Sequence, residues 1–163
     1  MTDALTRREN TERLHKAVTY YFVKKMFSVH REVGVQRWGA RRIDIMCLDF
    51  LSNIVGVEIK SCLADYRSDS KWRSYLEGPV NQFYFCFPPS VINSRVFPEI
   101  KAELKAEGVG ILALGENGRI RVIQNAKKRH VNIVAKHRLF IKLAWRAGDS
   151  KRNIKRTQAA RLV

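Results

Sequence analysis

Two short stretches of this chain decide its fold, namely Arg41-Arg42-Ile43-Asp44-Ile45 and Val57-Glu58-Ile59-Lys60-Ser61. Both are rich in Ile and Val, yet they also carry Asp, Glu and Lys, which are depleted in strands. Apolar and other residues alternate through Ile54-Val55-Gly56-Val57-Glu58-Ile59-Lys60, and this alternation predicts a strand. The same pattern is typical of a half-solvated antiparallel strand with no chemical role. Two carboxylates and an ammonium on adjacent strands would instead suit a metal-dependent phosphodiesterase site, and the pattern alone leaves both interpretations open.

The rest of the chain predicts an α/β fold around these stretches. Apolar residues at helical spacing predict helices near residues 10–27, 65–77 and 96–107. Short apolar runs predict strands near 29–38, 42–50, 53–61, 83–87, 109–114 and 119–123. The run Phe83-Tyr84-Phe85-Cys86-Phe87 has no charged residue, so we expect a central strand buried on both faces. The resulting order α-β-β-β-α-β puts Asp44 and Glu58 on neighbouring strands.

The chain resembles the PD-(D/E)xK nuclease superfamily, with Asp44, Glu58 and Lys60 at its three signature positions. Within that superfamily it is most similar to MmcB-type DNA-repair proteins, and the similarity covers roughly residues 10–123. Ile43 stands where the name of the superfamily has Pro. The resemblance implies a restriction-endonuclease-like αβββαβ core with a mixed central sheet flanked by helices. The residues that carry it are Arg41-Arg42-Ile43-Asp44, Val57-Glu58-Ile59-Lys60-Ser61, Ala64-Asp65-Tyr66-Arg67-Ser68-Asp69-Ser70-Lys71-Trp72-Arg73-Ser74-Tyr75 and Phe83-Tyr84-Phe85-Cys86-Phe87-Pro88.

Charge divides the chain into two parts. The protein has 31 Lys and Arg against 15 Asp and Glu, a net charge of +16, and residues 124–163 carry twelve cations and the single acid Asp149. We therefore expect a nuclease-like domain over residues 1–123 and a basic C-terminal extension over 124–163. Such dense charge of one sign attracts DNA phosphates, although a tail that only keeps the protein soluble has the same composition. The expected DNA contacts there are Lys127, Lys128, Arg129, Lys151, Arg152, Lys155 and Arg156.

The resemblance also implies a metal site. Mg²⁺, or Mn²⁺ in its place, would be held by Asp44, Glu58 and the backbone carbonyl of Ile59, because such ions prefer oxygen ligands. Lys60 would stabilise the charge that develops on the phosphate or orient the attacking water. A further carboxylate often completes these sites, and we expect Glu32 in this role, with Glu12 as the second choice. Either acid would otherwise be an ordinary surface residue.

Several residues near the signature are expected to line the DNA groove. Arg41 and Arg42 precede Asp44 and would contact phosphates. The segment after Lys60 contributes Asp65, Arg67, Asp69, Lys71 and Trp72, and Trp72 would stack on an unpaired base. The alternative is a capped helix with Trp72 and Tyr75 in the core.

Two functions of different classes follow. The first is a Mg²⁺-dependent DNA nuclease in repair, recombination or the DNA metabolism of a phage or another mobile element. The second is a non-catalytic DNA-binding protein that keeps the nuclease-like scaffold. No apolar run approaches the roughly 20 residues of a membrane span, so we expect a cytoplasmic, nucleoid-associated protein with no membrane partner. Whether it forms a homodimer stays open.

Overall fold

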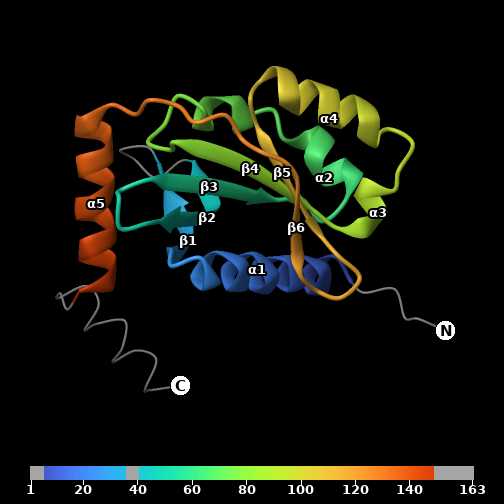
Figure 1. Ribbon diagram of the computed structural model, residues 1–163, viewed down its shortest axis with the longest axis horizontal. Helices are drawn as coiled ribbons and strands as arrows, with labels where there is room; N and C mark the ends of the chain where they lie inside the picture. Colours follow the sequence, from blue (N-terminus) through green and yellow to red (C-terminus); the bar gives the residue numbers. More distant parts are fainter. Residues whose placement is uncertain (1–5, 36–40, 149–163) are drawn as a thin grey trace. The chain divides into compact units, whose positions relative to one another are not determined.

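The structure is a computed structural model that describes residues 6–35 and 41–148. It contains two compact units, Met1–His130 and Val131–Val163. The first holds a six-stranded sheet in the order β1-β2-β3-β4-β5-β6 (Figure 1). Strands β3, β4 and β5 are parallel, and the remaining neighbours are antiparallel. The bounds are β1 Ser28–Gly34, β2 Arg42–Leu48, β3 Ile54–Ile59, β4 Gln82–Phe87, β5 Gly110–Leu114 and β6 Ile120–Gln124.

Helix α1, Arg7–Lys24, covers one face of the sheet (Figure 1). It begins earlier than expected because Thr6 and Glu9 form a capping box, in which the Thr6 hydroxyl accepts from the Glu9 N–H and the Glu9 carboxylate accepts from the Thr6 N–H. Its buried face, Leu14, Val18 and Phe22, packs in one cluster with apolar side chains of β2, β3, β4 and β5. The other face is covered by α2 Leu63–Ser68, η1 Trp72–Tyr75, α3 Pro89–Ile92 and α4 Phe97–Ala106.

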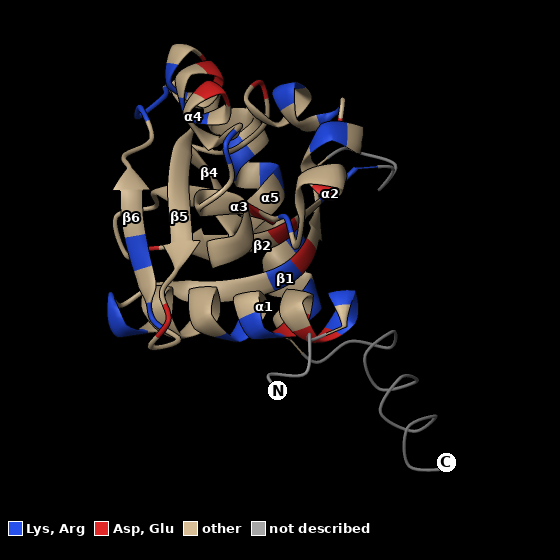
Figure 2. Cartoon of the chain, turned by 90° about the vertical axis from the view of Figure 1, so that its right-hand side faces the viewer, with Lys and Arg blue, Asp and Glu red and all other residues tan. Residues whose placement is uncertain are grey.

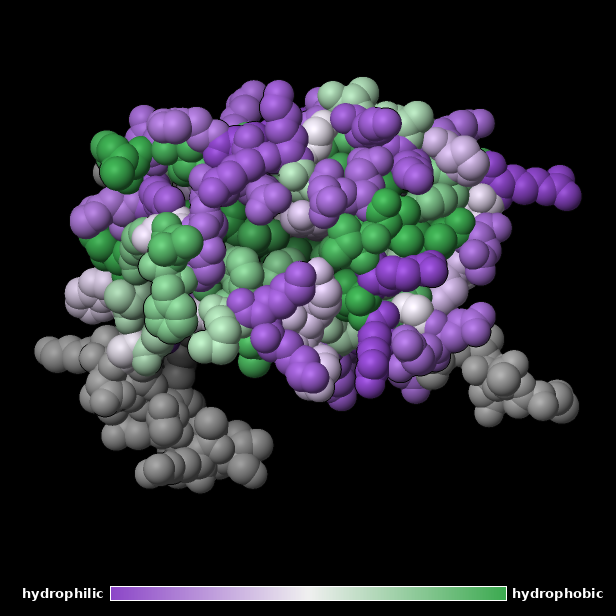
Figure 3. All heavy atoms as spheres, in the orientation of Figure 1, coloured by the Kyte–Doolittle hydropathy of each residue, from purple (hydrophilic) through white to green (hydrophobic). Residues whose placement is uncertain are grey.

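Strand β4 is the central strand that its apolar run predicts. Phe83, Phe85 and Phe87 have no exposed surface. Phe85 also makes edge-to-face contacts with Phe83 and Trp72, at centroid distances of 5.5 Å each. The α/β fold with a mixed sheet flanked by helices is therefore confirmed. In the space-filling view, hydrophilic residues cover α1 and α4, and apolar side chains show between these layers (Figure 3).

The prediction of one helix near residues 65–77 is wrong in one respect, because the chain leaves the helical conformation at Asp69. There the backbone is extended, with φ −87° and ψ 94°. The Asp69 carboxylate accepts a hydrogen bond of 2.9 Å from the Lys71 N–H, and such local side-chain bonds compete with a helix. The segment therefore forms the short helix α2 and the 3₁₀ turn η1, with Asp69 between them.

The unit that contains the sheet continues past residue 123, where we expected it to end, as far as His130. Residues 124–130 run past the start of β4 and β5, because their backbone is bonded to residues just before these strands. The Arg129 N–H donates to the Asn81 carbonyl at 2.7 Å, and the Lys127 N–H donates to the Gly108 carbonyl at 2.9 Å. Ala126 is buried in the core. The unit with the sheet therefore includes Lys127, Lys128 and Arg129 of the basic segment.

The second unit contains helix α5, Ile133–Ala147. Asn132 caps it, since its side-chain oxygen accepts from the Val134 and Ala135 N–H groups at 2.8 and 3.3 Å. Over the ranges 6–35 and 41–148, no helix combines the length and the apolar character needed to cross a membrane.

Candidate active site

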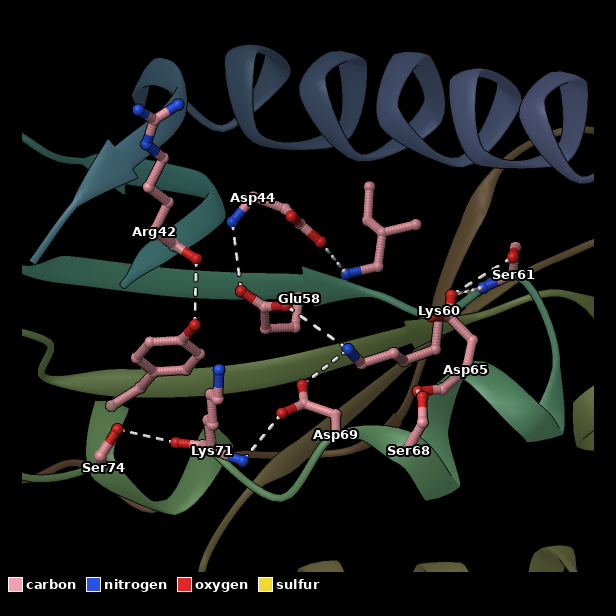
Figure 4. Close-up of polar contacts among 12 residues, drawn as sticks. Arg42, Asp44, Glu58, Lys60, Ser61, Asp65, Ser68, Asp69, Lys71 and Ser74 are labelled. Atoms are coloured by element: carbon pink, nitrogen blue, oxygen red, sulfur yellow. Dashed lines mark hydrogen bonds and ion pairs between the residues drawn. The ribbon is translucent and has the colours of Figure 1, made fainter. Parts of the chain in front are cut away.

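The candidate site lies where strands β2 and β3 separate. Their pairing runs from Leu48↔Ile54 to Ile45↔Val57 and stops there. Beyond it, the Asp44 N–H donates to Glu58 Oε1 at 3.2 Å, and the Ile59 N–H donates to Asp44 Oδ2 at 2.8 Å (Figure 4). The carboxylates of Asp44 and Glu58 thus accept the hydrogen bonds that backbone carbonyls accept in a regular strand pair. This arrangement brings Asp44 and Glu58 together, as their neighbouring strands predict.

Lys60 lies next to this pair, at the end of β3. Its ammonium is 2.6 Å from Asp69 Oδ2 and 3.6 Å from Glu58 Oε2 (Figure 4). Only 6% of Lys60 and 5% of Glu58 are exposed. A buried ammonium between two carboxylates has little freedom to move, so Asp69 holds Lys60 close to Glu58. Sequence reasoning gave Asp69 no specific role, and its only signal was an acidic residue in the segment after Lys60.

The surroundings of Asp44 and Glu58 disfavour the charged form of both carboxyl groups in the absence of a cation. Burial, followed by repulsion from Asp44, raises the pKa of Glu58 to about 9. Burial also raises the pKa of Asp44. Burial lowers the pKa of Lys60, but its hydrogen bond to Asp69 and the nearby Glu58 charge outweigh this effect and raise it overall. A cation beside the pair would therefore be favourable.

The donor set fits Mg²⁺, which commonly binds one or two carboxylates and completes its shell with water and phosphate oxygens. In the described ranges, no three His, Cys, Asp or Glu side chains gather closely enough to hold a metal ion. Glu32, which stands on the neighbouring strand β1, therefore does not form a three-carboxylate group with Asp44 and Glu58. Its φ is 51°, and the register of β1 with β2 passes from Arg31↔Ile45 to Val33↔Ile43 without a pair for Glu32.

Asp65 joins the start of α1 to the end of β3. Its Oδ2 accepts from the Ser61 N–H at 3.2 Å and from the Ser61 hydroxyl at 3.3 Å. Its Oδ1 accepts from the Arg7 guanidinium at 2.8 Å. Arg7 was not among the residues that we expected near the site, because only the fold brings it next to Ser61.

The residues expected in the DNA groove differ in exposure. Arg42, Arg67 and Lys71 are exposed, and Arg41 is half-buried. Trp72 is only 2% exposed, and its indole packs against Phe85 on one side. The Arg73 guanidinium lies 4.4 Å from the centre of the indole. Of the two alternatives for Trp72, the structure therefore has the core position, which leaves the indole no open face for a base.

The basic residues after β6 also divide into groups. Lys127 and Lys128 are exposed, whereas the Arg129 guanidinium donates to the Glu107 carbonyl and is partly buried. Arg129 is therefore engaged inside the protein. Lys151, Arg152, Lys155 and Arg156 lie outside the described residues. Figure 2 shows basic and acidic positions interleaved on α1 and α4.

Comparisons with known proteins agree with the fold. A protein of unknown function from Silicibacter pomeroyi has a similar structure, with a TM-score of 0.70 and 24% sequence identity over 98% of this chain and 93% of that one. SfsA from Pyrococcus furiosus, in complex with Ca²⁺, gives a TM-score of 0.39 and 14% identity over 76% of this chain and 65% of that one. The second likeness is too low to establish a shared fold. No curated protein matches the sequence.

The family comparison covers nearly the whole chain. The family described as DNA repair protein MmcB-like matches residues 2–152. The match includes the strands that carry Asp44, Glu58 and Lys60 and extends through α5. The chain therefore belongs to the MmcB-like DNA repair protein family.

Proposed function

We propose that the protein is a Mg²⁺-dependent DNA nuclease of the PD-(D/E)xK type that hydrolyses phosphodiester bonds during DNA repair. One observation carries the proposal: the half-buried Asp44 and the buried Glu58 lie side by side, with the Lys60 ammonium 3.6 Å from Glu58. Buried charges of this kind are costly, and they persist mainly where chemistry needs them. The family description supplies the DNA repair context.

Each residue of the group has a distinct role in this proposal. Asp44, Glu58 and the carbonyl of Ile59 would hold Mg²⁺, which when bound lowers the pKa of a water molecule and neutralises phosphate charge. Lys60 donates hydrogen bonds to a phosphate oxygen as negative charge develops on it, because its ammonium stays protonated. Asp69 keeps that ammonium in place. The low exposure of the group strengthens these electrostatic effects.

DNA would be held mainly through its phosphates. Arg42, Arg67 and Lys71 are exposed on elements that flank the site, and Arg41 is half-buried beside it. Lys127 and Lys128 add exposed charge after β6, and the basic extension adds more. Contacts of this kind bind DNA of any sequence.

The alternative, a DNA-binding protein without catalysis, is favoured by a different observation. Asp44 and Glu58 each accept a backbone N–H between the separated strands, so both have a structural use without a metal. In that case Lys60 would neutralise the buried carboxylates, and affinity for DNA would come from the exposed basic residues alone.

A cleavage assay separates the two functions. Purified protein is incubated with labelled linear, circular and forked DNA in Mg²⁺, Mn²⁺ or EDTA, and Lys60→Met is compared with the wild type. Lys60→Met removes the ammonium but keeps the length of the side chain. Lys101→Met, an exposed change on α4, serves as the control for the loss of a positive charge. Cleavage that needs the metal and Lys60 supports the nuclease, and DNA binding without cleavage of any substrate supports the alternative.

A further inference from the structure

A second polar site lies beside the candidate active site, in a pocket between the first turns of α1 and strand β1. Three arginines line it, Arg7, Arg8 and Arg31, together with the acids Glu12 and Glu32 and the imidazole of His15. Figure 2 shows basic and acidic positions of β1 next to those of α1. The catalytic proposal above uses none of these side chains, although we first expected Glu32, with Glu12 as the second choice, as a metal ligand.

His15 is the first indication that this pocket takes a ligand. Only 8% of the residue is exposed, although it lies on the lining of the pocket. Its Nδ1 is buried and has no hydrogen-bond partner among the residues that the structure describes. Buried polar atoms in proteins nearly always have a partner, and those that lack one need an explanation. Because Nδ1 has almost no exposed surface, a ligand in the pocket would supply that partner after a rotation of the imidazole ring toward it.

The arginines indicate the charge of the ligand. Arg31 makes only long contacts of 3.4 Å with both oxygens of Glu12, and both side chains are substantially exposed. Arg8 is exposed and has no ion-pair partner within residues 6–35 and 41–148. Guanidinium groups with free donors bind phosphate oxygens well, because their planar fork matches that group. The three arginines outnumber the acids Glu12 and Glu32 of the lining, so the pocket favours an anionic ligand with several acceptor oxygens.

The pocket is connected to the candidate active site by direct contacts. Arg7 donates to Asp65 at 2.8 Å, and Asp65 accepts from Ser61, the residue after Lys60. On the other side, Glu32 stands between Arg31 and Val33, which pair with Ile45 and Ile43, the two neighbours of Asp44. A ligand in the pocket would therefore lie close to DNA that binds at Asp44, Glu58 and Lys60.

We propose that this pocket binds a phosphate group of the substrate DNA, next to the phosphodiester that is cut. The proposal rests on the proposed function for the identity of the substrate, but the binding of phosphate can be tested without catalysis. The phosphate comes either from the backbone of a continuous strand or from a strand end. A phosphate at a strand end has a larger negative charge and three terminal oxygens.

The first test uses inorganic phosphate as the probe, at constant ionic strength in EDTA. The ring nitrogens of His15 are observed by ¹⁵N NMR while phosphate replaces chloride. We expect a saturable shift of the His15 signals that is lost in Arg31→Ala and kept in Arg13→Ala, a control that removes the same charge from the exposed side of α1 outside this pocket. His15 signals that do not respond to phosphate in the wild type would overturn the proposal.

A second variant separates phosphate binding from folding. His15→Phe removes the unpartnered nitrogen but keeps a ring in the buried position, so it should fold with a Tm close to that of the wild type. If His15 only fills space, His15→Phe will bind DNA as well as the wild type does. The proposal instead predicts about tenfold weaker binding, since one hydrogen bond to a charged group is removed.

The third test identifies the source of the phosphate. Binding of short duplexes with a 5′-phosphate or a 5′-hydroxyl is measured by fluorescence anisotropy in EDTA over a range of salt concentrations. Arg8→Ala should lower the log–log salt slope by about 0.9, the value for one phosphate that the protein no longer neutralises. A decrease confined to the 5′-phosphorylated duplex indicates a strand end, and an equal decrease for both indicates the backbone. A slope that equals that of the wild type on both duplexes argues against the pocket.

These experiments are independent of the proposed nuclease activity. If Lys60→Met cuts DNA like the wild type while the His15 signals respond to phosphate, the catalytic assignment fails and the phosphate pocket stands. If cleavage depends on Lys60 but His15 and Arg8 make no difference to binding, the pocket fails and the nuclease stands.

Discussion

Asp44 and Glu58 replace part of the backbone pairing between β2 and β3. The Glu58 carboxylate accepts the N–H of Asp44 at 3.2 Å, and the Asp44 carboxylate accepts the N–H of Ile59 at 2.8 Å. The strands thus separate at the point where the acids stand, and their separation makes room for the carboxyl groups. Each carboxylate is bonded to a backbone N–H of the other strand, and these bonds hold the two acidic groups at a constant distance.

The first prediction concerns the carboxylates and Lys60. Asp44→Asn, Glu58→Gln and Lys60→Ala should each lower cleavage by about 10²-fold or more while DNA affinity changes little, because these groups act on the metal and the transition state. Both amide variants keep an oxygen that can accept the backbone N–H. Calorimetric titration with Mn²⁺ should show weaker binding in the two amide variants. Unchanged metal affinity in both would place the ion elsewhere.

The second prediction concerns pH. The pKa of Glu58 is raised from 4.5 to about 9, first by burial and then by Asp44. The folded state therefore prefers the neutral carboxyl, and this contribution to stability is complete below about pH 4.5 and is lost as the pH rises toward 9. In EDTA, the wild-type Tm should fall over this range more steeply than that of Glu58→Gln, and Mg²⁺ should reduce the difference. Parallel calorimetric profiles of the two proteins would contradict the shift.

The third prediction concerns Asp69, which holds Lys60 at 2.6 Å. Asp69→Asn keeps an acceptor for the Lys71 N–H but removes the charge that fixes the ammonium. We expect kcat to fall by about 10²-fold with KM nearly unchanged, because a small displacement of a catalytic group has an effect of that size. Asp69→Glu, which restores the charge, should recover part of the rate. Equal kcat values for Asp69→Asn and the wild type would show that Lys60 needs no anchor.

The fourth prediction concerns the core. Phe85→Asp should unfold the first unit, since a charge without a partner at a fully buried position costs several kcal/mol of the roughly 5–15 available. Phe50→Asp provides a matched control, because Phe50 is 88% exposed on the β2–β3 turn. Circular dichroism melts should therefore show a cooperative transition for Phe50→Asp only. A native-like melt of Phe85→Asp would be incompatible with the central position of β4.

The fifth prediction concerns the basic extension. Removing residues 149–163 leaves α5 intact and deletes five cations, Lys151, Arg152, Lys155, Arg156 and Arg161. DNA binding should weaken uniformly across sequences, and the log–log salt slope should decrease by about 0.9 for each phosphate that these cations neutralise in the intact protein. At saturating DNA, the cleavage rate should persist because the candidate site lies within the first unit. If truncated and intact proteins have the same slope, the extension does not bind DNA.

Local patterns were sufficient for most of the fold. The apolar run of β4 predicted a strand with neighbours on both sides, and the alternation in β3 predicted its bounds within two residues. The order of elements along the chain then placed Asp44 and Glu58 on adjacent strands. These features depend on residues close together in the sequence, so the spacing of apolar residues along the chain predicts them.

The remaining features depend on contacts between distant residues, and no linear pattern contains them. Asp69 contacts Lys60 because the hydrogen bond from the Lys71 N–H to its carboxylate ends the expected helix at that point. Trp72 lies in the core because its indole packs against Phe85 of β4. The pocket around His15 exists only because β1 returns past the start of α1. The sequence by itself thus determined which strands carry the acidic pair. Tertiary packing alone decided which groups surround it, because burial and the distance between charges arise only when the elements pack together.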